Sequence, residues 1–180
     1  MKAVICLAFT IFICFAVHIP NAFSQDECPQ NIVDIKKDSR FRNVVFDNLD
    51  VYTLSSGLWC QYYKNGKLEY EIPPLETGIS RKYYESGKLQ SEWQVKEGKQ
   101  DGLTRRYYEN GALHQELTFK NDRIEGVLEV YRSNGKMFAT ITYEKGSPVS
   151  GVCHHTNGKT SPLTNAELTN FENGLDITCD

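Results

Sequence analysis

The residues with the clearest potential for chemistry are three neighbours, Cys153, His154 and His155. A thiolate and an imidazole can bind zinc, and a cysteine beside a histidine can act as a nucleophile with its base. On a strand, however, adjacent side chains point to opposite faces, so the two histidines cannot easily share one ion. The sequence also has no C-x-x-C or H-x-x-x-H spacing to complete a metal site. We therefore expect no metal, no cofactor and no catalytic residue.

The cysteines indicate structural bonds instead. Four of them follow residue 24, and an even number is typical of two disulfides in an oxidising compartment. A disulfide would leave Cys153 without the thiolate that catalysis needs. Four cysteines allow three pairings. We favour Cys28–Cys60 and Cys153–Cys179, because each bond would fasten a terminal segment to the body of the chain. Each would close a loop of roughly 30 residues and contribute on the order of 3–4 kcal/mol.

The N-terminal residues have the pattern of a secretory signal. Lys2 is the only charge before Asp26, residues 3–17 are almost entirely apolar, and Ala22 and Ser24 are small residues at the positions that a signal peptidase reads. We expect cleavage after Ser24. The alternative is a membrane anchor, but an apolar run of about 15 residues is shorter than the roughly 20 of a spanning helix. The chain is therefore predicted to be exported, periplasmic or secreted, with no transmembrane segment after cleavage.

The charge of the chain argues against nucleic acid as a partner. The net charge is −3 at pH 7, and removal of Lys2 with the signal would make it −4. Binding to nucleic acid relies on clustered positive charge that neutralises phosphates, and a mildly acidic chain has no such excess.

A repeated pattern of glycine and tyrosine organises the middle of the chain. Four glycines, spaced 21, 24 and 24 residues apart, each open a similar stretch of sequence. An aliphatic residue follows each of them, a tyrosine lies five places on, and a second glycine lies nine places on. The opening glycines are Gly57, Gly78, Gly102 and Gly126, the tyrosines are Tyr62, Tyr83, Tyr107 and Tyr131, and the second glycines are Gly66, Gly87, Gly111 and Gly135. A period of this length is typical of a repeat protein.

Each repeat is predicted to be a β-hairpin. Asn110-Gly111 and its counterparts are Asn-Gly or Ser-Gly pairs, which favour a type I′ turn with a two-residue loop. Aromatic and β-branched residues flank these pairs, as in strands. In this register Arg105 lies opposite Glu116 and Arg81 lies opposite Glu92. We interpret these glutamates as members of cross-strand ion pairs rather than as acid catalysts.

Alternation along the strands predicts two different faces. One should carry large apolar side chains, among them Trp59, Leu68, Trp93, Leu113 and Leu117. The other, the tyrosine face, should carry the recurring tyrosines with most of the arginines and glutamates. Because tyrosine and arginine are favoured at interfaces, we predict that the tyrosine face binds a partner. Its candidate binding residues are Tyr62, Tyr83, Tyr107, Tyr131, Arg81 and Arg105. The alternative is a solvated surface whose charges serve only as cross-strand pairs.

The recurring G-x-x-x-x-Y-Y-x-N-G-K-L, followed by a polar link that ends in glycine, resembles the MORN repeat in the variant form found widely in bacteria. The resemblance covers about residues 57 to 160. It implies an elongated sheet of stacked hairpins without a catalytic centre. Proteins of this group are often labelled antitoxin-like components of toxin–antitoxin systems, and others are described as scaffolds, dimerisation modules or lipid binders. For an exported chain the resemblance implies an interaction protein, with an immunity-type role as one form of it.

The predicted architecture is mainly β, an elongated single sheet of stacked antiparallel hairpins with a cap at each end. The signal occupies 1–24, an N-terminal capping segment with a degenerate hairpin occupies 25–56, four to five hairpin repeats occupy 57–160, and a helical cap occupies 161–180. Polar links such as 96–102 are expected to join successive hairpins. Thr164 and Glu167 form a capping box, which predicts a short helix from about Asn165 to Glu172.

These features together favour a non-catalytic exported repeat protein that acts as an interaction or scaffold module in the periplasm or cell envelope. The expected partner is another protein of the envelope. A module that binds glycan or lipid through the tyrosine face is the alternative, because exposed tyrosine rings can stack on sugars. An enzyme is the third hypothesis, and we expect a screen for hydrolase activity to find none.

Overall fold

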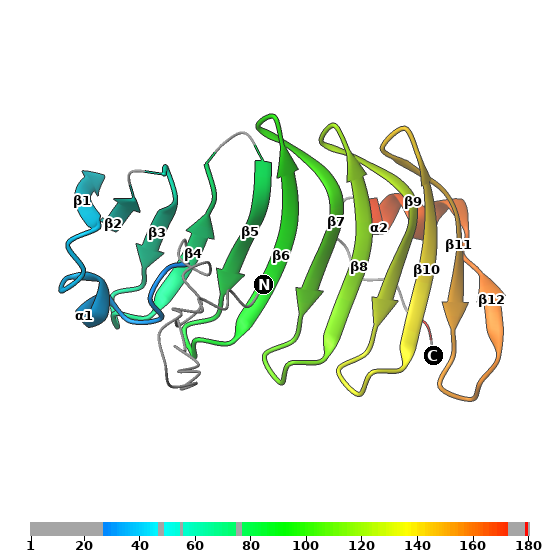
Figure 1. Cartoon of the computed structure of the whole chain (residues 1–180). Coiled ribbons are helices and arrows are strands. Elements are labelled where there is room, and N and C mark those ends of the chain that lie inside the picture. The colour runs from blue at the N-terminus through cyan, green and yellow to red at the C-terminus, as the bar shows by residue number, and fades with distance from the viewer. Residues whose placement is uncertain (1–26, 47–48, 55, 75–76, 173–178, 180) are drawn as a thin grey trace, which may run out of the picture.

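One antiparallel sheet forms the body of the protein. The computed structural model describes residues 27–46, 49–54, 56–74, 77–172 and 179, and the predicted signal, residues 1–24, lies outside them. The described chain forms twelve strands that lie side by side in the order in which they occur in the sequence (Figure 1). The predicted fold, a single elongated sheet of stacked hairpins with a short C-terminal helix, is confirmed.

The elements follow one another as a meander with a short helix at each end. The helices are α1 (Ile32–Ile35) and α2 (Asn165–Glu172), and neither of these described helices is long and apolar enough to cross a membrane. The predicted N-terminal hairpin is present, and its loop, residues 47–48, lies outside the described residues. The strands are β1 (Phe41–Phe46), β2 (Leu49–Leu54), β3 (Trp59–Tyr62), β4 (Leu68–Ile72), β5 (Thr77–Tyr83), β6 (Leu89–Lys96), β7 (Lys99–Tyr107), β8 (Leu113–Lys120), β9 (Arg123–Tyr131), β10 (Met137–Glu144), β11 (Ser147–His154) and β12 (Thr160–Pro162).

The Asn-Gly hairpins have three-residue loops instead of the predicted two-residue type I′ loops. In the third repeat the N–H of Tyr108 donates to Ala112 O and the N–H of Gly111 donates to Tyr108 O, each at 2.8 Å. Of the three loop residues 109–111, only Gly111 has a positive φ, +88°. A type I turn followed by a left-handed glycine has this geometry. Asn110 contributes its side chain instead, which accepts the N–H of Ala112 at 2.9 Å.

The two-residue loops of type I′ lie at the other edge of the sheet, within the polar links. Glu97-Gly98, Asn121-Asp122 and Lys145-Gly146 each have two consecutive residues with φ between 50° and 90°, as this turn requires. Strand pairing continues up to the first of these turns, where Lys96 lies opposite Lys99. The links expected as polar returns are therefore mostly strand, and the hairpins and links form one continuous ladder.

A β-bulge beside the Asn-Gly or Ser-Gly turn of each of the four repeats changes which side chains share a face. In the third repeat Arg106 pairs with Gln115 but Tyr107 pairs with Leu113, so His114 is an extra residue. Directly opposite residues point to the same face, and a shift of one residue exchanges the faces. The prediction that Leu68 and Leu113 lie away from the tyrosines is therefore wrong. The four cross-strand pairs on the tyrosine face are Tyr62 with Leu68, Tyr83 with Leu89, Tyr107 with Leu113, and Tyr131 with Met137.

The second residue of each tyrosine pair joins its repeat to the next one. The hydroxyls of Tyr63, Tyr84 and Tyr108 donate at 2.7–2.8 Å to the backbone carbonyls of Tyr83, Tyr107 and Tyr131, respectively. In the fourth repeat Arg132 replaces this tyrosine. Its Nη2 donates to the corresponding carbonyl, that of His154, at 3.1 Å. Side-chain bonds thus connect the hairpins at the edge of the sheet that carries the Asn-Gly turns.

The two caps lie on opposite faces and at opposite ends of the sheet, as the positions of α1 and α2 show (Figure 1). The N-terminal cap, residues 28–35, packs on the tyrosine face of the first repeat. There Cys28 is bonded to Cys60, and Ile35, Leu58 and Tyr62 are buried in the same cluster.

The C-terminal cap packs on the reverse face, the face that carries Trp59, Trp93 and Leu128. Leu163 and Leu168 are buried there against Leu128. Cys153 and Cys179 form the second disulfide, so both bonds are those favoured from the sequence.

Helix α2 begins with the predicted capping box. The N–H of Thr164 donates to Glu167 Oε2 at 2.7 Å, and the N–H of Glu167 donates to Thr164 Oγ1 at 3.3 Å. Each side chain satisfies a backbone donor of the other residue, which the first turn of a helix would otherwise leave without a partner.

We expect Tyr84→Phe to lower the free energy of unfolding by about 1 kcal/mol, because the carbonyl of Tyr107 loses its donor. Urea unfolding followed by circular dichroism measures this change. Tyr131→Phe is the matched control, since its hydroxyl bonds a carboxylate of its own repeat. Equal losses in the two variants would show that the bond between repeats contributes nothing of its own.

Candidate functional site

The N-terminal cap covers the first of the residues predicted to bind a partner. Tyr62 is only 3% exposed, its hydroxyl donates to Pro29 O at 2.7 Å, and its ring meets Tyr52 edge to face. Burial raises the pKa of the Tyr62 phenol. Tyr62 is thus a core residue under the cap, and this placement corrects the expectation that it belongs to a binding surface.

The other three predicted tyrosines are progressively further from the cap. Tyr83 is half-buried and packs against the cap cluster. The Tyr107 hydroxyl donates to Glu92 Oε1 at 3.0 Å, and the Tyr131 hydroxyl donates to Glu129 Oε2 at 2.6 Å. Burial and this bond to Glu92 raise the pKa of Tyr107, and the bond to Glu129 raises the pKa of Tyr131 to about 12.

A row of six charged residues, which we call the charge ladder, crosses the tyrosine face from β4 to β9. Strand pairing places each of its members directly opposite the next. In order they are Glu71, Arg81, Glu92, Arg105, Glu116 and Glu129. The ladder includes both predicted cross-strand pairs, Arg81 opposite Glu92 and Arg105 opposite Glu116.

Most steps of the ladder join opposite charges. Arg81 Nη1 is 2.5 Å from Glu71 Oε1, so its ion pair is with the preceding strand. Arg105 Nε is 2.7 Å from Glu116 Oε2, and its Nη1 is 3.8 Å from Glu92 Oε1. Glu71 is 4% exposed, and its second oxygen accepts the N–H of Cys28 at 2.9 Å. The cap is therefore bonded to the first member of the ladder.

The last step of the ladder joins like charges. Glu116 on β8 lies opposite Glu129 on β9, where the two preceding repeats place an arginine in the position of Glu129. Like charges directly across a sheet are destabilising. The hydroxyl of Tyr131 is the only donor that we find on Glu129 among the described residues. The tyrosine face thus has excess negative charge beyond Arg105.

Exposed aliphatic side chains flank the ladder on the same face. The residue that follows the opening glycine is 3% exposed in the first repeat, Leu58, but 42% exposed in the second, Ile79, and 51% in the fourth, Val127. The cap accounts for this contrast because it packs on the first repeat. Tyrosines, charges and exposed aliphatic groups together form a surface suited to binding a partner.

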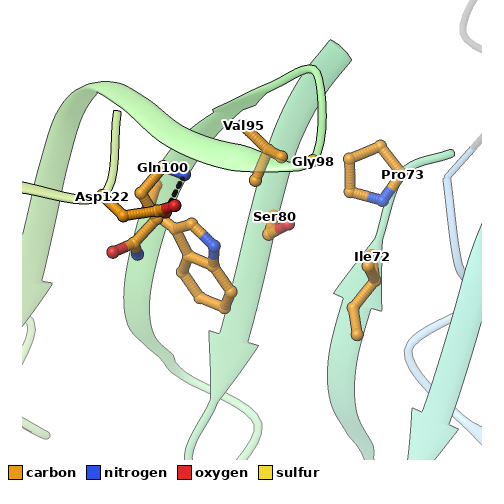
Figure 2. Close-up of a pocket in the computed structure, with 8 residues that line it drawn as sticks. Ile72, Pro73, Ser80, Val95, Gly98, Gln100 and Asp122 are labelled. Carbon is orange, nitrogen blue, oxygen red and sulfur yellow. Dashed lines mark hydrogen bonds between the residues drawn. The ribbon is translucent and has the colours of Figure 1, made fainter. Parts of the chain in front are cut away.

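The reverse face has a hollow of about 310 Å³ near the edge that carries the two-residue turns (Figure 2). It forms where β4 and β5 separate. These strands pair at only two positions, and Pro73, which has no N–H to donate, follows β4. The small side chain of Ser80 lies between Ile72 and Val95 (Figure 2).

The lining of the hollow is mostly apolar. Its acidic member, Asp122, accepts the backbone N–H of Gln100 at 2.7 Å, as the dashed line in Figure 2 shows. Ile72, Pro73, Trp93 and Val95 supply aliphatic and indole surface. The hollow could hold an apolar group of a ligand, but its lining carries no pair of groups for acid–base chemistry.

The three neighbouring residues that were candidates for chemistry, at positions 153–155, do not form one site. Cys153 is in its disulfide, the Nε2 atom of His154 is buried without a hydrogen bond, and the Nε2 atom of His155 is 2.8 Å from Ser161 Oγ. The two histidines therefore have separate surroundings. Within the part of the chain that the structure describes, no group of three or more histidine, cysteine, aspartate or glutamate residues could hold a metal ion.

Two features of the surface were not predicted. One is the set of hydrogen bonds from the second tyrosine of a repeat to the next repeat, made by Tyr63, Tyr84 and Tyr108. The recurrence of a second tyrosine directly after the first was a signal for it in the sequence. The docking of residues 28–35 onto the first repeat has no periodic signal. Only the disulfide from Cys28 to Cys60 pointed to it.

Comparison with protein families finds the MORN repeat variant at residues 56–73, 76–97 and 100–121. These segments contain the hairpins of the first three repeats, β3–β4, β5–β6 and β7–β8. Repeats of this kind are commonly interaction modules, and the match suggests a repeat protein for protein or lipid interaction. No curated protein matches the chain.

Among solved structures, a chain of the crystal structure of a GtfA/B complex bound to UDP and GlcNAc is similar over 74% of this chain, with 8% sequence identity and a TM-score of 0.31. The match spans only 28% of that chain. A similarity at this level supports no conclusion about fold or function.

We expect Glu129→Arg to raise the free energy of unfolding by about 0.5 kcal/mol, because an arginine would continue the alternation of the ladder next to Glu116. Urea unfolding at low salt measures the gain, and 1 M salt should reduce it by screening. Glu129→Gln is the control, since it removes the repulsion without adding an attraction. A gain no larger than that of Glu129→Gln would contradict an electrostatic role for the ladder.

Proposed function

We propose that this protein is a non-catalytic, exported interaction module that binds a protein of the periplasm or cell envelope through the tyrosine face of its second to fourth repeats. The observation that carries the proposal is the contrast between repeats. The same face that the cap buries in the first repeat remains accessible in the later ones, with Ile79 and Val127 exposed beside the charge ladder.

The composition of this surface supports a protein partner. Tyrosine and arginine contribute most at the centres of protein interfaces, and exposed aliphatic side chains supply apolar area that a partner can cover. Tyr107 and Arg105 on β7 and Val127 on β9, which β8 separates, combine these properties. An immunity-type role is the case in which the partner is a toxin.

The state of the reactive side chains supports a role without catalysis. The four cysteines among the described residues are all in disulfides, so none offers a thiolate. His155 and Ser161 are hydrogen-bonded as a base and a nucleophile could be, but they flank the tight turn before the short strand β12 rather than the hollow.

The two disulfides also favour an oxidising compartment and so support export.

We expect Val127→Arg to abolish capture of the partner, because a charge would replace an exposed aliphatic side chain of the surface. The mature protein is cross-linked in the envelope fraction of its native source, and captured proteins are identified by mass spectrometry. Val33→Arg is the matched control, because Val33 on α1 is 53% exposed and Val127 is 51% exposed.

A partner that both variants retain would show that the tyrosine face is not the binding surface. Loss with Val127→Arg alone would support the proposal. If wild-type protein captured no protein but bound glycan or lipid, and Val127→Arg prevented that binding, the alternative ligand class would replace the protein partner.

We expect export to remove the first 24 residues. Intact mass and N-terminal sequencing of the protein from its native source should give a chain that begins at Gln25, because cleavage follows the small residue Ser24. A chain in the cytoplasm that retains Met1 would contradict export. The disulfides provide a second readout, since a cytoplasmic chain would have reduced cysteines.

A further inference from the structure

The N-terminal cap is, in effect, a peptide ligand already bound to one copy of the repeat surface. Besides the disulfide, it makes three kinds of polar contact. The N–H of Cys28 donates to the ladder carboxylate of Glu71 at 2.9 Å, and the Tyr62 hydroxyl donates to Pro29 O at 2.7 Å. The backbone of residues 30–32 pairs with the hairpin turn, where Leu68 N–H donates to Gln30 O at 3.1 Å and Ile32 N–H donates to Gly66 O at 2.8 Å.

The same contact positions recur in the fourth repeat without a cap. Each lies 69 places further along, since Tyr131 corresponds to Tyr62. Leu58, Cys60, Tyr62, Gly66, Leu68 and Glu71 correspond to Val127, Glu129, Tyr131, Gly135, Met137 and Thr140.

The turn glycines show that this second copy of the surface is open. A Cβ added to Gly66 would be 2.9 Å from Cγ2 of Ile32 in the cap, whereas a Cβ added to Gly135 would meet nothing within 4 Å. Gly66 is buried and Gly135 is exposed. Val127 is 51% exposed where Leu58 is 3% exposed. The space that the cap fills on the first repeat is therefore available on the fourth.

The fourth repeat differs from the first at two polar contact positions, because Thr140 takes the place of the Glu71 carboxylate and Glu129 takes the place of Cys60. Cys60, which bonds to Cys28, is replaced by Glu129, and strand pairing places Glu129 opposite Glu116. A segment bound here in the manner of the cap would place its side chain at the Cys28 position over Glu129. A cation at that position would supply the opposite charge that the ladder lacks.

We propose, on the basis of the proposed function, that the fourth repeat binds an extended segment of a protein partner in the way that the first repeat binds the cap, with an arginine or lysine placed over Glu129 and Glu116. The Tyr131 hydroxyl would turn from Glu129 to a backbone carbonyl of the segment, as Tyr62 bonds Pro29. An apolar side chain would pack on Gly135 and Met137, as Ile32 packs on Gly66.

The sequence of the cap supplies a probe for this site. A fluorescently labelled nine-residue peptide with the sequence of residues 27–35, carrying Cys28→Arg, is titrated with the full mature protein at low salt. The same peptide with Cys28→Glu is the matched control. We expect the arginine peptide to bind at least about tenfold more tightly than the glutamate peptide. The arginine would bring a positive charge to the carboxylates of Glu129 and Glu116, whereas the glutamate would bring a third negative charge.

The charge-swapped protein makes the test reciprocal. With Glu129→Arg, which is expected to fold at least as stably as the wild type, the arginine peptide should lose about tenfold in affinity and the glutamate peptide should gain. Val127→Arg should weaken both peptides. Reversal of the preference supports the inference.

Two results would overturn the inference. One is failure of the arginine peptide to bind the wild-type protein at about 1 mM, a weak affinity by the standard of specific complexes. The other is a preference between the peptides that Glu129→Arg leaves unchanged. If Val127→Arg still abolished capture of the native partner, the proposed function would stand and the partner would dock as a folded surface rather than as an extended segment.

Discussion

A sheet of a single layer has two faces to shield from water, and among the described residues two short segments cover them. Each cap covers one end of one face, and the two caps lie on opposite faces. The buried clusters are consequently separate, one around Tyr62 and one around Ile141. On β5, β6 and β7 the buried positions are small and polar, namely Ser80 and Thr104. Apolar burial alone therefore does not hold the centre of the molecule together.

Hydrogen bonds and ion pairs between repeats make up for the missing second layer. The tyrosine hydroxyls that donate to the next repeat act at the edge that carries the Asn-Gly turns, and the charge ladder acts across the centre of the tyrosine face. In a stack of this kind stability comes from each repeat and from its contact with its neighbours. Arg132 extends the series to the C-terminal segment by bonding the carbonyls of both His154 and Cys179. The side chains that hold the stack together and those that form its accessible surface are thus adjacent in sequence, as Tyr107 and Tyr108 illustrate.

Sequence reasoning succeeded where the signal was local or periodic. The hairpin stack followed from glycine and tyrosine spacing, α2 from its capping box, and the disulfides from the even number of cysteines. It failed at the turns, because an Asn-Gly pair is compatible with two loop lengths and the bulge that distinguishes them adds one residue without a sequence mark. That residue, His114 in the third repeat, moved Leu113 to the tyrosine face. The burial of Tyr62 could not be predicted either, since it depends on a segment about 30 residues away in the chain.

The regular bonding from one hairpin to the next has a consequence for how such a molecule can change in length. Each repeat carries its own donor and acceptor, so one more 24-residue unit could be inserted without altering either end. Strands lie about 4.8 Å apart, and an insertion of two strands would move the ends apart by about 10 Å. The length of the sheet can therefore change in steps of one repeat while both caps stay the same. The number of repeats can also vary independently of the side chains, such as Glu129, that distinguish one repeat from the next.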